Sequence, residues 1–159
     1  MAWWDYAVLG QRAFRATSAC PLNVWENIFT VSGGLVLMTL LVGERTVIQA
    51  GGASNLDLQV DPTAGAAVAL CIPTVVTIDA VGTIYTITGN PADPVYAGLA
   101  VQGGMAGGAL ATGQNTHGWV LPPGTVDWRE SAGAGTGSVQ WTMYYFPIDP
   151  EASVAGAAL

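Results

Sequence analysis

The sequence has very little positive charge. It contains no lysine, and four arginines stand against eleven acidic residues, for a formal net charge of −7. Nucleic-acid binding depends on clustered Lys and Arg that displace counterions from phosphates, so no nucleic-acid partner is expected. Charged residues make up 9% of the chain, against roughly 25% in ordinary soluble proteins. A surface with so little charge tends to associate, and we expect partners to cover much of it.

Residues suited to catalysis or metal binding are also scarce. The chain has one histidine, His117, and two cysteines, Cys20 and Cys71, all far apart. A structural zinc site uses about four such ligands, and no Gly-x-Ser-x-Gly motif accompanies the histidine. Asp57 and Asp61 could share one strand face near calcium, but a solvated strand face explains them better. The sequence therefore predicts no enzyme, no catalytic residue, no cofactor and no metal.

The two cysteines leave one structural question open. Cys71 lies in the apolar run ALCIP and is expected to be a buried small hydrophobe. A disulfide with Cys20 is possible, although two cysteines do not make a disulfide framework.

Long hydrophobic runs are absent as well. The strongly apolar stretch from Leu35 to Val42 is far shorter than the ~20 residues of a membrane helix. The N-terminus shows no basic segment followed by an apolar one, so no signal peptide is predicted. These observations favour synthesis in a cytoplasm without membrane insertion, and 159 residues favour a single domain.

The patterns that are present belong to β-strands. Leu56, Leu58 and Val60 alternate with polar residues, and the run from Gly137 to Phe146 places Val139, Trp141, Met143 and Tyr145 on one face. No amphipathic helical period of useful length accompanies them. With many Gly and Pro turns between such runs, the chain is predicted to be all-β, a single-domain sandwich or barrel.

The stretch from Asn27 to Glu44 is expected to organise this fold. Its two β-type runs are joined by Ser32-Gly33-Gly34, which predicts a hairpin. The second run, like the aromatic strand that ends at Phe146, is apolar on both faces and needs cover on both. We therefore expect a homo-oligomer, with a trimer favoured. Its predicted interface residues are Leu35, Leu37, Leu40, Tyr144 and Phe146.

Residues 1–20 differ from the rest of the chain, and 21–159 are predicted to form the β domain. This segment is aromatic and basic, with no clean strand or helix period. It is either a terminal arm packed on its own domain or an extended arm that docks on a partner. The second interpretation rests on residue types that anchor interfaces. The candidate partner-binding residues are Trp3, Trp4, Tyr6, Arg12, Phe14 and Arg15.

Three phrases of the sequence resemble a family of small virion proteins from tailed bacteriophages. They are IFTVSGGLVLMTLLVGE at 28–44, DAVGTIYTITG at 79–89 and GTGSVQWTMYYFPIDPEASVAGA at 135–157. The resemblance covers roughly residues 27 to 157, leaves out the N-terminal segment and carries no catalytic residues. It implies a structural component of the virus particle.

The expected function is therefore capsid decoration. A homo-oligomer on the outside of the head would bind the major capsid protein or other virion proteins and stabilise the lattice. The first alternative is a tail, neck or fibre component of the virion. The second is a carbohydrate-binding module that would use Trp119, Trp128 and Trp141 as stacking platforms. Against it, Trp128 and Trp141 fall on apolar strand faces, where packing in the core is the better expectation.

Overall fold

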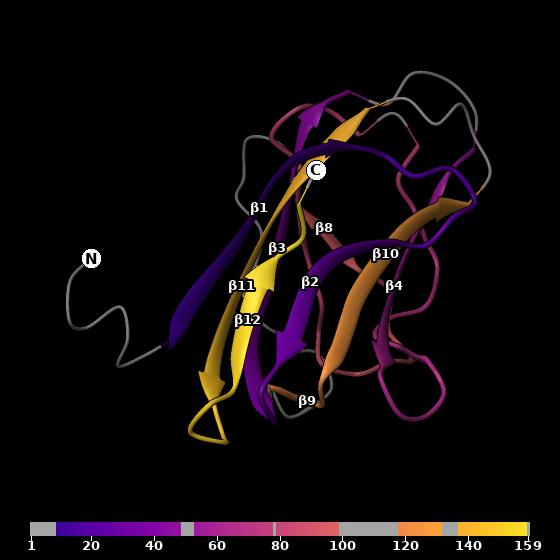
Figure 1. The fold of residues 1–159 in the computed structure, drawn as a ribbon. Coiled ribbons are helices and arrows are strands. Elements are labelled where there is room, and N and C mark those ends of the chain that lie inside the picture. The colour runs from indigo at the N-terminus through magenta and orange to yellow at the C-terminus, as the bar shows by residue number, and fades with distance from the viewer. Residues whose placement is uncertain (1–8, 49–52, 78, 99–117, 132–136, 159) are drawn as a thin grey trace.

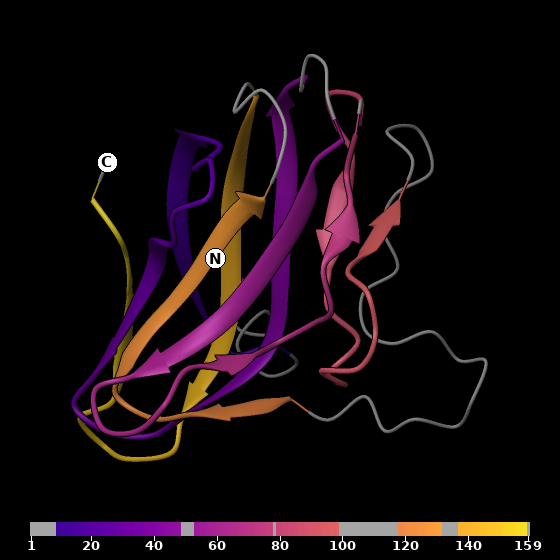
Figure 2. The same ribbon diagram turned by 90° about the vertical axis from the view of Figure 1, so that its right-hand side faces the viewer.

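A computed structural model shows two antiparallel β-sheets packed as the two layers of a sandwich (Figures 1 and 2). The structure describes residues 9–48, 53–77, 79–98, 118–131 and 137–158. The predicted all-β sandwich is confirmed. Within the described ranges no helix is long and apolar enough to cross a membrane.

The first layer, sheet A, has the strand order β1-β11-β3-β7-β8, with β9 also pairing with β3. Its strands are β1 (Gln11–Ala19), β3 (Val36–Val47), β7 (Ile84–Thr86), β8 (Tyr96–Gly98), β9 (Trp119–Leu121) and β11 (Ser138–Pro147). The second layer, sheet B, has the order β12-β2-β10-β4-β5, with β6 also pairing with β4. Its strands are β2 (Glu26–Ser32), β4 (Asn55–Pro62), β5 (Val68–Ala69), β6 (Thr74–Val75), β10 (Gly124–Ser131) and β12 (Ser153–Gly156).

The core lies between the inner faces of the two sheets. The alternation predicted for β4 and β11 holds, since every second side chain of each strand is buried. Trp128 of β10 and Trp141 of β11 meet across the layers with ring centroids 5.5 Å apart in an edge-to-face arrangement. Such a pair adds about 0.5–1.5 kcal/mol beyond the area it buries, so it helps fix how the sheets stack.

The predicted hairpin at Asn27 to Glu44 is wrong. Its two strands do not pair, because β2 belongs to sheet B and β3 to sheet A. Gly33 and Gly34, both at positive φ, carry the chain from one layer to the other. A Cβ on Gly33 would lie 2.1 Å from the carbonyl oxygen of Glu151, so close packing against the 149–151 turn also requires glycine. In the apolar run after the turn, Val36, Met38 and Leu41 are buried in the core, whereas Leu37 and Leu40 face outward.

The boundary predicted at residue 20 is corrected for residues 11–19. They form β1, the edge strand of sheet A, which pairs antiparallel with β11 from Gln11 to Ala19. A register irregularity between Arg15 and Ser18 interrupts the alternation, which is why the sequence shows no clean strand period there. Residues 1–8 lie outside the described part of the chain.

On the outer face of sheet B, Asp61 is exposed as predicted, but Asp57 is not solvated. Asp57 is only 5% exposed, and its Oδ2 accepts a hydrogen bond of 2.8 Å from Arg129 Nε on the neighbouring strand. The Arg129 guanidinium also lies 4.4 Å from the ring centroid of Trp25. Among the described residues, no group of three His, Cys, Asp or Glu side chains lies close enough together to hold a metal ion.

Candidate functional site

The outer face of sheet A gathers the apolar side chains predicted to mediate assembly. Strand register places Tyr144 opposite Leu40 and Phe146 opposite Leu37. All four are half-buried and lie on the side of the sheet that faces away from the core. Val120 of β9 pairs with Leu37 and is 54% exposed. These residues therefore form one contiguous apolar surface across three strands.

Two residues predicted to bind a partner lie on the same surface. Phe14 of β1 pairs with Thr142 and is 46% exposed, and Arg12 pairs with Tyr144. The Arg12 guanidinium lies 5.2 Å from the centroid of the Phe14 ring. From here on, the outer face of sheet A means Arg12, Phe14, Leu37, Leu40, Val120, Tyr144 and Phe146. Two of the six predicted partner-binding residues, Arg12 and Phe14, thus lie on the surface that carries the predicted oligomer residues.

Arg15 does not belong to this surface, so it is not one of the exposed anchors predicted beside Arg12 and Phe14. Strand alternation turns it inward opposite Trp141, and it is 3% exposed. Its guanidinium is hydrogen-bonded to Ser18 and forms an ion pair with Glu26 of sheet B. The positive charge of Arg15 is therefore neutralised by a residue of the same chain, because a buried cation needs an anion close by.

Four predicted residues remain. One, Leu35, precedes a strand, and the other three lie outside the described part of the chain. Leu35 is 38% exposed and precedes β3, with its backbone N–H donating to Asp149 Oδ2 at 2.7 Å. It borders the outer face of sheet A. The predicted anchors Trp3, Trp4 and Tyr6 lie outside the described residues, as does His117.

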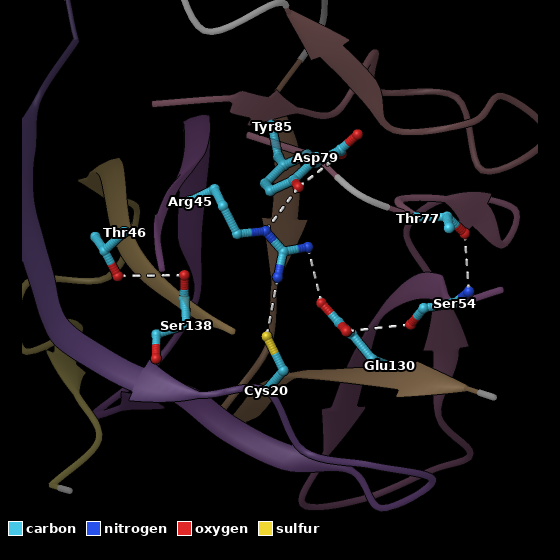
Figure 3. Close-up of polar contacts among 9 residues, drawn as sticks. All are labelled: Cys20, Arg45, Thr46, Ser54, Thr77, Asp79, Tyr85, Glu130 and Ser138. Carbon is cyan, nitrogen blue, oxygen red and sulfur yellow. Dashed lines mark hydrogen bonds and ion pairs between the residues drawn. The ribbon is translucent and has the colours of Figure 1, made fainter. Parts of the chain in front are cut away.

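A second cluster, which the sequence did not predict, lies between the sheets (Figure 3). Arg45 of β3 and Glu130 of β10 form an ion pair of 3.0 Å, and both side chains are 0% exposed. Arg45 also donates from Nε to the Tyr85 hydroxyl and from Nη1 to Cys20 Sγ, each at 3.1 Å. The other carboxylate oxygen of Glu130 accepts a bond of 3.1 Å from Ser54 Oγ. The buried charges are thus closely paired and hydrogen-bonded.

This cluster holds both sheets and two connecting segments together. Tyr85 donates to Asp79 Oδ2 at 2.8 Å, and the backbone N–H of Ser54 donates to Thr77 Oγ1 at 3.1 Å. Burial raises the pKa of Tyr85, and the bond to Asp79 adds to that rise. The phenol therefore stays protonated and keeps donating. An enclosed, mutually satisfied network of this kind favours a structural role, because a reacting molecule could not reach it.

The sequence contained a usable signal for this cluster. Leu41, Gly43 and Arg45 follow the inward period of β3, and Val126, Trp128 and Glu130 follow that of β10. Extending each apolar alternation by two residues would have placed both charged side chains inside. Cys20 and Tyr85 carry no comparable signal, because their contacts with Arg45 depend on how the sheets stack.

Both cysteines are buried free thiols, so the possible disulfide is not formed and Cys71 is buried as predicted. Burial, together with the nearby Glu130 carboxylate, raises the pKa of Cys20 from 9 to about 12. Burial raises the pKa of Cys71 from 9 to about 11.

Neither thiol is therefore expected to react with iodoacetamide at pH 8 while the chain is folded, since the thiolate is the nucleophile. Both should react once urea unfolds the protein, as mass spectrometry can show. The folded chain holds these protons more tightly than the unfolded one. Their contribution to stability is thus complete below pH 9 and is lost as the pH rises toward 12. Rapid native labelling of Cys20 would contradict the closed cluster.

The three tryptophans suggested as sugar-stacking platforms are unequal candidates. Trp128 and Trp141 are 0% and 1% exposed, so their rings are part of the core. Trp119 is half-buried and packs against that core. Stacking on a sugar requires an open ring face, so Trp128 and Trp141 cannot serve as platforms, and their expected packing in the core is confirmed.

Compared with protein-family models, with curated proteins and with solved structures, the chain matches none of them.

Proposed function

We propose that this chain is a structural virion protein that decorates and cements a bacteriophage head. The observation that carries the proposal is the outer face of sheet A, where apolar side chains of three neighbouring strands meet exposed Phe14 and Arg12. Aromatic and arginine side chains are the usual anchors of interfaces. The resemblance in sequence to tailed-bacteriophage virion proteins supplies the setting.

Assembly is the first part of the proposed role. A stable interface takes about 800 Å² from each partner, roughly a tenth of the 7792 Å² surface of this chain. We propose that copies associate through the outer face of sheet A, as a trimer, and present the remaining surface to neighbouring capsid subunits.

The mechanical consequence follows from multivalency. An oligomer that contacts several capsid subunits at once converts weak single contacts into a strong joint attachment. Each contact then resists separation of the subunits it bridges. No bond needs to be made or broken chemically, which agrees with a polar cluster that is enclosed between the sheets.

Imaging of particles from the natural source tests this role. Antibody fragments against the purified protein should label the outside of heads at many regular positions in electron micrographs. Labelling confined to tails, necks or fibres would replace decoration with the alternative virion role. Absence of the protein from purified particles, measured by mass spectrometry, would contradict any structural role in the virion.

A further inference from the structure

A groove separates the edge of sheet A from the edge of sheet B. It is shallow and open to solvent, with a volume of about 810 Å³. One wall is residues 17–19 of β1. The other comprises Glu26, Asn27 and Thr30 of β2, and residues 156–158 at the end of β12 complete it. The outer face of sheet A contributes no residue to this lining.

The walls of the groove are strand edges. Residues 17–19 are consecutive in β1, and the groove lies on the side of this strand away from β11. β1 pairs with β11 on one edge, and no described strand pairs with the other. β12 pairs with β2 only from Phe29 to Ser32, and beyond it Ala157 N–H donates to Ile28 O at 3.0 Å. Edges of this kind present N–H and C=O groups that a further strand can bind.

The groove begins where the two sheets touch. A Cβ on Gly156 would lie 2.1 Å from the carbonyl oxygen of Phe14, so β12 and β1 are in close backbone contact there. Immediately beyond, the irregular register between Arg15 and Ser18 interrupts β1. Ala19, Gly156, Ala157 and Ala158 give the walls small side chains, which leaves space for another backbone to approach.

Two buried polar atoms of the groove residues have no partner among the described residues. They are Nε of Arg15, a donor, and Oδ1 of Asn27, an acceptor. An unpaired buried polar group costs about 1–3 kcal/mol. Arg15 and Glu26 neutralise each other, so the lining carries no net charge. A neutral group with one acceptor and one donor would satisfy both atoms, and a peptide unit is such a group.

We propose that this groove binds an extended, uncharged polypeptide segment of a partner protein, which adds as a strand to the free edge of β1. The carbonyl oxygens of the segment accept from β1 and Arg15, and its N–H groups donate to β1 and Asn27. Main-chain bonds supply affinity in strand addition, and small or polar side chains fit the narrow walls. A sugar could meet the same two atoms, but it would leave the edge of β1 unpaired. The inference is independent of the proposed virion role.

Nuclear magnetic resonance titration of the full chain tests this site. The probe is a capped eight-residue peptide of alternating serine and valine. The matched control is the same peptide with N-methyl groups on alternate residues, which removes half of its donors. The unmodified peptide should give saturable shifts of the Thr17, Ser18 and Ala19 amides at millimolar concentration. The N-methylated peptide should bind at least tenfold more weakly.

Variants of β1 complete the test. Thr17→Trp fills the groove and should weaken binding at least tenfold, whereas Ala16→Trp, on an exposed neighbour outside the lining, should change it less than twofold. Thermal melting confirms that each variant is folded, and Thr30→Trp on the opposite wall replaces Thr17→Trp if that variant is not. The proposal is overturned by unsaturable or absent shifts, by equal binding of the N-methylated peptide, or by shifts on another surface.

Discussion

Replacing Arg45 with methionine is expected to lower the free energy of unfolding by about 3–5 kcal/mol. The substitution keeps an apolar side chain of similar length in the space but leaves the Glu130 carboxylate buried without its cation. Tyr85 and Cys20 lose a donor at the same time. Small domains have only about 5–15 kcal/mol of stability, so this loss is a large part of the total.

Urea denaturation followed by tryptophan fluorescence measures the effect. The double variant Arg45→Met with Glu130→Leu should recover most of the loss, because an apolar pair replaces a buried charged one at little cost. Arg129→Met is the comparison variant, since its guanidinium is 35% exposed and water can take its place beside Asp57, so the loss of stability should be smaller than for Arg45→Met even though Asp57 is itself buried. An Arg45→Met variant as stable as the Arg129→Met variant would show that the buried pair is not structurally important.

The second large effect concerns the outer face of sheet A. Leu40→Glu places a carboxylate in the middle of this face, beside Tyr144. If copies associate through the face, the charge must be buried without a partner, which costs several kcal/mol. Self-association should weaken at least roughly a hundredfold, the equivalent of about 2.7 kcal/mol. The fold should persist, since Leu40 is turned away from the core.

A matched substitution on the other layer separates this effect from a general effect of charge. Val75 of β6 in sheet B is 67% exposed, more than any other large apolar side chain described. Val75→Glu should leave self-association unchanged. Circular dichroism of both variants should match that of the parent chain, because neither substitution reaches the core.

The strand pattern allowed the fold class to be predicted, because burial on one face produces alternation that survives in the sequence. β11 follows it along the strand, and in β4 only the buried Asp57 departs from it. The hairpin prediction failed for a physical reason. Gly33 and Gly34 indicate a sharp turn, but a turn within one sheet and a turn between two sheets require the same positive φ. Which strands pair is decided by long-range contacts that local residues do not encode.

The candidate surface could be predicted better than the buried cluster. Leu37 and Tyr144 could be predicted as interface residues because they are apolar on the outward face, where a sandwich that stays monomeric needs polar side chains. The prediction that Arg15 is exposed is wrong. A charged side chain usually lies at the surface, but the ion pair with Glu26 on the other sheet stabilises Arg15 in a buried position. Pairings between residues distant in sequence, such as Arg45 with Glu130, depend on the stacking of the sheets and could not be read locally.

Sedimentation velocity of the unmodified chain and of Leu40→Glu, both at micromolar concentration, tests the central claim most directly. The account predicts a discrete oligomer, a trimer, for the unmodified chain and a folded monomer for the variant. Val75→Glu should sediment with the unmodified chain. A well-folded monomer of the unmodified chain at this concentration, or a Leu40→Glu variant that remains fully associated, would contradict assembly through the outer face of sheet A.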